Sequence, residues 1–301
     1  VLAAPEVSEW HIWDNCRTEA DRRYIEQLAA SDPRCQLKRL PGPTGGWGLI
    51  GEFFRFCDDP EALYLRLDDD IVYIEPGFFP RFIQRALPER GKAFWFSPLV
   101  INNALCSFML KHLAPVQIGG PVSAQCMCPY SRAYPTFPLA MHPVFIEAVR
   151  RNRLSDFRTP DREVRMARFS VNAFGFFGED RVRLGEGFMS PTGGEEEWLS
   201  SILPAKENRH GTIFGDLIVS HFSYYTQEAA LLRTSLLEGY YEIAGLPPIA
   251  YDKPPLKKKK RKLKDVLRPW KKRPPYGGPE YQIALSDAGA LAPEPVKPHS
   301  G

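Results

Sequence analysis

The sequence predicts an α/β fold in which helices flank a mixed, mainly parallel sheet. Short apolar segments with strand character alternate with segments whose apolar residues recur at helical spacing. This alternation is typical of strand–helix–strand units, which build parallel sheets covered by helices. With 301 residues, 44% of them hydrophobic, the chain can bury one sizeable core. We therefore expect one folded domain over residues 1–248 and a tail over residues 249–301.

Local signals delimit the elements of this domain. Loops are marked by Asp14 and Asn15, by the Pro- and Gly-rich residues 41–46, and by Pro76-Gly77. The expected strands are residues 10–13, 36–40, 62–67 and 94–98, with another inside 215–225, and residues 71–74 and 169–177 are also apolar. The expected helices are one that carries Tyr24, Ile25 and Leu28, one over about residues 49–56, one that contains Phe82 and Ile83, and one over residues 195–202.

Three adjacent carboxylates, Asp68, Asp69 and Asp70, directly follow the strand predicted at residues 62–67. Carboxylates this close repel one another unless a cation neutralises them. In open α/β sheets, ligands bind beyond the carboxyl ends of the strands, which is where this triplet is expected. Hard oxygen ligands suit Mg²⁺ or Mn²⁺. By itself, however, the triplet is equally typical of an acidic surface turn.

The segment Tyr64-Leu-Arg-Leu-Asp-Asp-Asp-Ile-Val-Tyr resembles the strand and D-x-D motif of GT-A glycosyltransferases, of the bacterial family-two type. The resemblance implies that Asp70 binds the metal and that Asp68 faces the ribose or the sugar, with Asp69 beside them in the nucleotide-sugar site. An earlier family motif, a buried strand that ends in an acidic turn, resembles Ile12-Trp-Asp-Asn. Asp14 would then contact the nucleotide base.

Two later segments resemble further motifs of the family. Gly193-Gly-Glu-Glu-Glu-Trp-Leu resembles the acidic motif that supplies the catalytic base of inverting members, which makes Glu196 the first candidate and Glu195 the second. Carboxylates at a helix start also have a purely structural explanation, because the helix dipole favours them there. The strand that contains His221 resembles the one whose histidine completes the metal site, although a lone histidine among aromatic residues is more often part of a core.

The resemblance covers about residues 10–240 and implies a metal-dependent transferase. Transfer proceeds with inversion if a glutamate acts as base, whereas a retaining route is open if no carboxylate lies opposite the leaving group. The transferase would move a sugar from a nucleoside diphosphate sugar, with UDP as the expected nucleotide, to a hydroxyl of a glycan or lipid-linked acceptor, using Mn²⁺ or Mg²⁺ as cofactor. Residues 104–159, rich in proline and aromatic residues, are expected on the acceptor side. The family begins with a strand ahead of the one matched at residues 10–13, and we expect this domain to lack it.

Two other functions fit the same scaffold, because a fold does not fix a function. One is nucleotidyl transfer, although the sequence shows no glycine-rich, basic phosphate loop near its start. The other is a non-catalytic module that binds a carbohydrate or a partner protein. Binding of a nucleotide that depends on a metal and on Asp70 distinguishes the transferase from the non-catalytic module.

The tail differs from the body in charge. Residues 1–252 carry 26 basic and 32 acidic side chains, whereas residues 253–301 carry 13 and 4. The basic residues alternate with apolar ones that would share one helix face, Leu256, Leu263, Leu267 and Trp270. This pattern predicts either an interfacial anchor on anionic lipid or a solvated tail, and we expect no nucleic-acid partner.

Cysteine usage and hydropathy bear on the location of the protein. The six cysteines are scattered in a chain of this length, so no disulfide framework is required. No apolar run reaches the roughly 18 to 20 residues that a membrane-spanning helix needs. We therefore expect a cytoplasmic protein, peripheral at the membrane if the tail acts as an anchor.

Overall fold

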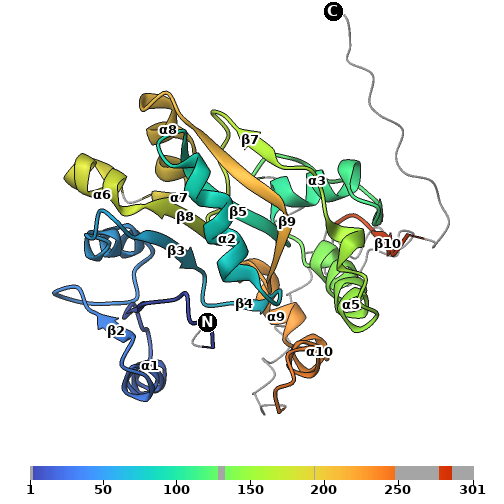
Figure 1. Cartoon of the computed structure of the whole chain (residues 1–301). Helices are drawn as coiled ribbons and strands as arrows, with labels where there is room; N and C mark the ends of the chain where they lie inside the picture. Colours follow the sequence, from blue (N-terminus) through green and yellow to red (C-terminus); the bar gives the residue numbers. More distant parts are fainter. Residues whose placement is uncertain (1–2, 128–132, 193, 248–277, 287–301) are drawn as a thin grey trace, which may run out of the picture. The chain divides into compact units, whose positions relative to one another are not determined.

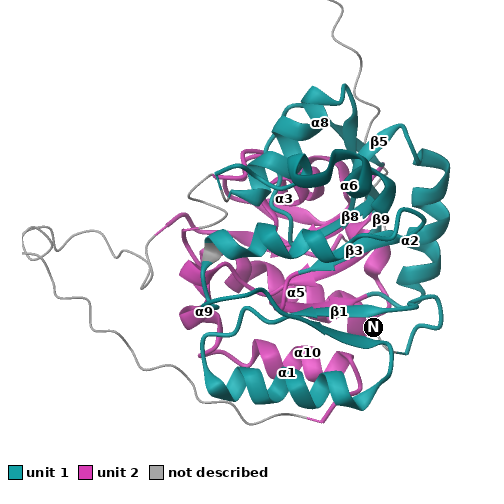
Figure 2. Ribbon diagram, turned by 90° about the vertical axis from the view of Figure 1, so that its left-hand side faces the viewer, with its two compact units in different colours: residues 1–67, 75–98, 161–217 teal, residues 68–74, 99–160, 218–301 magenta. Residues whose placement is uncertain are grey.

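A computed structural model describes residues 3–127, 133–192, 194–247 and 278–286 (Figure 1). The basic segment of the tail, predicted as either an interfacial anchor or a solvated tail, lies outside these residues. The chain divides into two compact units, coloured in Figure 2. Unit 1 comprises Val1–Leu67, Glu75–Pro98 and Asp161–Leu217, and unit 2 comprises Asp68–Ile74, Leu99–Pro160 and Ile218–Gly301.

The described strands form one six-stranded sheet and two small ribbons. They are β1 (Trp10–Trp13), β2 (Cys35–Lys38), β3 (Leu63–Leu67), β4 (Ile71–Ile74), β5 (Ala93–Ile101), β6 (Gln117–Gly119), β7 (Arg162–Val164), β8 (Ala173–Phe177), β9 (His210–His221) and β10 (Gln282–Ala284). The large sheet has the order β3-β8-β5-β9-β4, with β7 also paired to β9. β1 pairs with β2 in parallel, and β10 pairs with β6 antiparallel.

The prediction of an α/β fold is confirmed, but the prediction of a mainly parallel sheet is wrong. The sheet is mixed, and the pairs β3·β8, β5·β8, β4·β9 and β7·β9 are all antiparallel. Leu63, for example, pairs with Phe177, more than a hundred positions along the chain. A local pattern of strands and helices predicts which segments are extended, but the direction of such distant pairs depends on tertiary contacts.

The helices cover most of the predicted positions. The α-helices are α1 (Glu19–Ser31), α2 (Phe78–Ala86), α3 (Ala104–Leu113), α5 (Thr136–Arg150), α6 (Gly178–Leu184), α7 (Glu195–Glu197), α8 (Leu203–Lys206), α9 (Tyr225–Leu231) and α10 (Leu236–Ile243). Tighter 3₁₀ turns are η1 (Trp47–Phe56), η2 (Leu87–Glu89), η3 (Leu154–Phe157) and η4 (Gly185–Phe188), and η5 (Trp198–Ile202) is a π turn. The helix expected over residues 49–56 is therefore a 3₁₀ helix.

The core of unit 1 is built from aromatic side chains. The buried Trp95 ring of β5 stacks on Phe169, with ring centroids 5.0 Å apart, and lies 5.6 Å from Phe174. Gly211 of β9 allows this packing, because a Cβ atom at that position would lie 1.8 Å from the indole ring. Close packing of this kind leaves no room for a side chain at residue 211.

Unit 2 packs its core around α5, which lies within the proline- and aromatic-rich residues 104–159. Phe145 of α5 meets the Tyr73 ring of β4 edge-on, with centroids 5.3 Å apart, and contacts Phe157 at the same separation. Pro143 lies inside α5. Because proline usually ends a helix, it obscures the helical pattern of this segment in the sequence.

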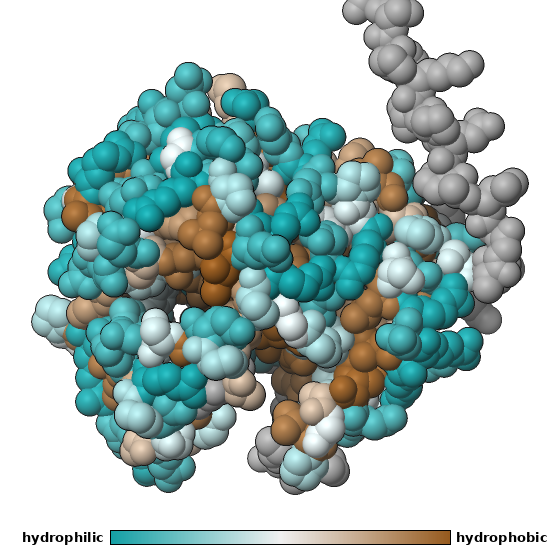
Figure 3. Space-filling model, in the orientation of Figure 1, coloured by the Kyte–Doolittle hydropathy of each residue, from teal (hydrophilic) through white to brown (hydrophobic). Residues whose placement is uncertain are grey.

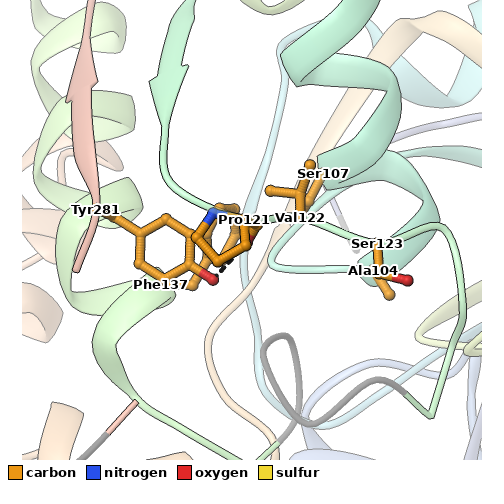
Figure 4. A pocket seen from close by; sticks show the side chains of 7 residues that line it. All are labelled: Ala104, Ser107, Pro121, Val122, Ser123, Phe137 and Tyr281. Carbon is orange, nitrogen blue, oxygen red and sulfur yellow. Dashed lines mark hydrogen bonds between the residues drawn. The ribbon is translucent and has the colours of Figure 1, made fainter. Parts of the chain in front are cut away.

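The composition of residues 276–301 predicts disorder, but the described part of that segment, residues 278–286, contains β10. Tyr281, just before β10, packs edge-on against Phe137 and donates a hydrogen bond of 2.7 Å to the Pro121 carbonyl oxygen. Both rings line a pocket of about 10 Å³, which holds at most one water molecule (Figure 4). A few aromatic contacts thus order a segment whose composition predicts disorder.

Hydrophilic side chains cover most of the visible face in Figure 3, and the exposed large hydrophobic residues are dispersed along the chain. Among the described helices, none is both long and apolar enough to cross a bilayer.

Candidate functional site

Strand pairing in unit 2 brings the aspartate triplet to the end of β9. Asp69 and Asp70 form a turn after β3, and the Ile71 N–H donates to the Asp68 carbonyl oxygen at 3.3 Å. β4 then pairs with β9 so that Ile71 lies opposite His221. Because antiparallel partners face each other directly, His221 is placed beside the residue before Ile71, which is Asp70.

Three contacts fix Asp70 against the end of β9. Its carbonyl oxygen accepts a hydrogen bond of 2.9 Å from the Phe222 N–H. Its Oδ2 accepts one of 3.2 Å from the Ser223 N–H. Its Oδ1 lies 3.2 Å from Nε2 of His221. The carboxylate is therefore held by backbone on one oxygen and faces an imidazole with the other.

Among the described residues, Asp68, Asp70 and His221 are the one group that offers three metal-ligating side chains. One ligand atom from each lies within 4.8 Å of the others. His221 is buried, whereas about 30% of the Asp70 side chain is exposed. Ligands on neighbouring positions of an octahedral Mg²⁺ site, each 2.0–2.1 Å from the ion, lie about 3 Å apart. The separation of 3.2 Å between Asp70 and His221 fits such a site.

The electrostatics of this group favour a positive charge. Burial opposes protonation of His221, but the charge of Asp70, the hydrogen bond to its carboxylate and the charge of Asp68 outweigh it, so the pKa of His221 is raised. Two carboxylates beside an imidazole are also a suitable donor set for Mn²⁺ or Mg²⁺. The side chains thus fit a divalent cation in both geometry and charge.

The structure separates Asp69 from its neighbours. Asp69 is exposed and does not belong to the group of three. The predicted role of Asp69 in nucleotide-sugar binding therefore has less geometric support than the roles of Asp68 and Asp70.

Asp14 belongs to unit 1 and follows β1, as the sequence predicts. Its buried carboxylate accepts a hydrogen bond of 2.9 Å from Nε of Arg39 and one of 3.3 Å from the Cys16 N–H, and Arg22 lies 3.6 Å away. Burial raises the pKa of Asp14, but these partners outweigh it and the pKa is lowered overall. Asp14 is thus a charged residue that organises the turn after β1.

The acidic motif also lies in unit 1, where Glu195 and Glu196 begin α7. Oε1 of Glu196 accepts a hydrogen bond of 2.6 Å from Nε of Arg168. The Glu196 carbonyl oxygen accepts one of 2.5 Å from the Ser200 hydroxyl, in the π turn that follows α7. π turns are rare in proteins, and those that do occur are often found at functional sites. Arg168 engages one oxygen of the preferred base, and Glu195 and Glu196 are both half-buried.

Sequence reasoning missed three buried polar residues around Phe222. His142 and Asn102 both donate to the Phe222 carbonyl oxygen, at 2.9 and 3.1 Å. The amide nitrogen of Asn102 also donates a hydrogen bond of 3.1 Å to Oε1 of Gln227. The sequence does contain one signal for such residues, which is a polar side chain inside an apolar segment. A side chain of this kind must form hydrogen bonds within the protein if it is buried.

Comparison with known proteins adds no assignment. No protein-family model matches the sequence, and neither the curated proteins nor the solved structures include a significant match.

Proposed function

We propose that this protein is a metal-dependent glycosyltransferase of the GT-A kind that uses a nucleoside diphosphate sugar, with UDP as the nucleotide. The convergence of Asp68, Asp70 and His221 in one group carries the proposal. Two of these residues come from the motif resembling D-x-D, and the third lies about 150 positions away. A surface turn of acidic residues would not require a buried histidine at its side.

In this proposal, Asp70 and His221 hold Mn²⁺ or Mg²⁺, and Asp68 faces the ribose or the sugar. The bound cation would stabilise the negative charge that develops on the leaving nucleoside diphosphate. The chain's own contribution is orientation: the Ser223 N–H fixes one oxygen of Asp70, and His221 faces the other. Preorganised ligands of this kind need little rearrangement when the ion binds.

The proposed base is a glutamate at the start of α7, with Glu196 as first choice and Glu195 as second. A carboxylate would take the proton of the acceptor hydroxyl as that oxygen bonds to the anomeric carbon and the bond from this carbon to the nucleoside diphosphate breaks. One displacement of this kind inverts the anomeric carbon. Arg168 donates to Oε1 of Glu196 and thereby holds the carboxylate of the first candidate in place. Asp14 is proposed to contact the nucleotide base, and a glycan or lipid-linked hydroxyl is the proposed acceptor.

Titration with UDP by isothermal calorimetry, with and without Mn²⁺, tests the proposal. We expect binding to require Mn²⁺ and the Asp70→Asn variant to lose the Mn²⁺-dependent part. Asp58→Asn is the matched control, because it removes the same charge from an exposed position outside the group of three. Binding of UDP that is equal with and without Mn²⁺, or that Asp70→Asn leaves unchanged, would contradict the metal site.

A further inference from the structure

A chain of buried hydrogen bonds in unit 2 connects the helices α5 and α10 to the end of β9. Nδ1 of His142, on α5, lies 2.7 Å from the Tyr240 hydroxyl of α10. The same hydroxyl lies 2.7 Å from the Ser220 hydroxyl of β9. Nε2 of His142 lies 2.9 Å from the Phe222 carbonyl oxygen. All of these side chains are buried, so every donor and acceptor has to be satisfied within the protein.

Chemistry fixes the direction of each hydrogen bond in this chain. The Phe222 carbonyl oxygen can only accept, so Nε2 of His142 carries the proton. In the neutral ring Nδ1 is then an acceptor, and the Tyr240 hydroxyl donates to it. The Ser220 hydroxyl therefore donates to the Tyr240 oxygen. The neutral imidazole of His142 thus has a single tautomer, which donates to one carbonyl group.

That carbonyl group is part of the peptide unit that reaches the candidate metal site. The C=O of Phe222 and the N–H of Ser223 belong to one planar peptide, in which the two bonds point in opposite directions. His142 binds its oxygen, and Oδ2 of Asp70 accepts from its N–H at 3.2 Å. Fixing the oxygen therefore fixes the direction in which the N–H points.

Two further contacts strengthen this arrangement. Asn102 donates a second hydrogen bond to the Phe222 oxygen, at 3.1 Å, so the oxygen is held from two sides. The His142 ring also stacks on the Phe222 ring, with centroids 5.8 Å apart. Linked hydrogen bonds polarise one another, so donation to the oxygen makes the Ser223 N–H a better donor.

We propose that His142 is a positioning residue for the group of Asp68, Asp70 and His221. It acts through the peptide between Phe222 and Ser223, which aims its N–H at the Asp70 carboxylate and lies one residue beyond His221. The inference rests on the proposed metal site and adds a residue that touches neither the ion nor the substrate. The expected consequence of its loss is a metal site whose carboxylate is no longer oriented.

Mn²⁺ affinity, measured by electron paramagnetic resonance on the full chain without nucleotide, tests the proposal. His142→Phe removes the donor and keeps an aromatic ring, and we expect about tenfold weaker Mn²⁺ binding, as for other outer partners of metal ligands. His142→Gln places an amide N–H near the position of Nε2, and we expect an affinity within about threefold of the native protein, because the donor to the carbonyl oxygen is kept.

Ile146→Ala is the control for a general loss of stability. Ile146 lies one turn further along α5, is buried and packs against Gly239 of α10. We expect this variant to lower the melting temperature and to keep the native Mn²⁺ affinity at temperatures where it is folded.

The outcomes separate this inference from the proposed function. If the native protein binds Mn²⁺ and Asp70→Asn does not, but His142→Phe binds as tightly as the native protein, the positioning role is wrong and the metal site stands. The role is also wrong if His142→Gln is as weak as His142→Phe, or if Ile146→Ala weakens binding equally. If the native protein binds no Mn²⁺, both proposals fail.

Discussion

Acidification should destabilise the protein through His142. Burial is the main cause that lowers the pKa of this imidazole, to about 4 from an ordinary value of 6.5. The hydrogen bond to the Phe222 carbonyl oxygen and the charge of Asp70 oppose the shift, and the charge of His221 adds to it. Protonation of Nδ1 would also break the hydrogen bond from Tyr240. A charged His142 is therefore poorly accommodated in the folded state.

The size of the effect follows from the two pKa values. Because the folded pKa is lower, the unfolded chain binds more protons between about pH 4 and 6.5, and stability rises with pH in that window. The contribution of His142 is complete above about pH 6.5 and is lost as the pH falls toward 4. Between about pH 7.5 and pH 5, the loss amounts to about 2 kcal/mol in the free energy of unfolding.

Guanidinium unfolding of the native protein and of His142→Gln, at about pH 7.5 and about pH 5, measures this contribution. His221 has a raised pKa, so its own contribution is lost as pH increases and runs in the opposite direction, but it is present in both proteins. We expect the cost of His142→Gln to be about 2 kcal/mol smaller at the lower pH. A cost that is the same at both pH values would refute the reasoning, because it would mean that His142 titrates normally in the folded protein.

Two further substitutions test the base and the core. Glu196→Gln should reduce the rate of sugar-donor turnover by about 100-fold or more, whereas a loss confined to Glu195→Gln would transfer the role of base to that residue. Gly211→Ala should lower the free energy of unfolding by about 3 kcal/mol or more, because its Cβ would lie 1.8 Å from the Trp95 ring. Gly187→Ala is the control for this second prediction, since no described atom lies within 4 Å of its added Cβ; an equal loss in both variants, seen in thermal melts, would show that packing against Trp95 is not the cause.

The order of the elements could be predicted from the sequence because their signals are local. The apolar run before Asp68 and the interruption at Asp14 both coincide with the ends of strands in the structure. The group of Asp68, Asp70 and His221 could be anticipated from motif order, which is information about a family rather than about local physics.

Other features depend on contacts that no short window contains. The direction of β8 relative to β3 is set by a pairing between distant segments. The role of His142 depends on α5 and α10 packing against each other, and the helical pattern of α5 is obscured by Pro143. Order in β10 depends on β6, more than 150 positions earlier, whereas its own composition predicts disorder. In each case the deciding partner is remote in the sequence.

The register of β4 against β9 explains why Asp70, and not a later residue, meets His221. Ile74 lies opposite Val219 and Tyr73 opposite Ser220, so regular pairing would place Val72 opposite His221. Instead the register shifts, and Ile71 takes that position. A bulge of this kind adds one residue to one strand and redirects the side chains beyond it, and bulges are frequent beside functional sites. Without it, Asp70 would lie one residue further past the histidine, beyond the reach of the contact at 3.2 Å. The carboxylate and the imidazole meet because β4 carries one residue more than its partner needs.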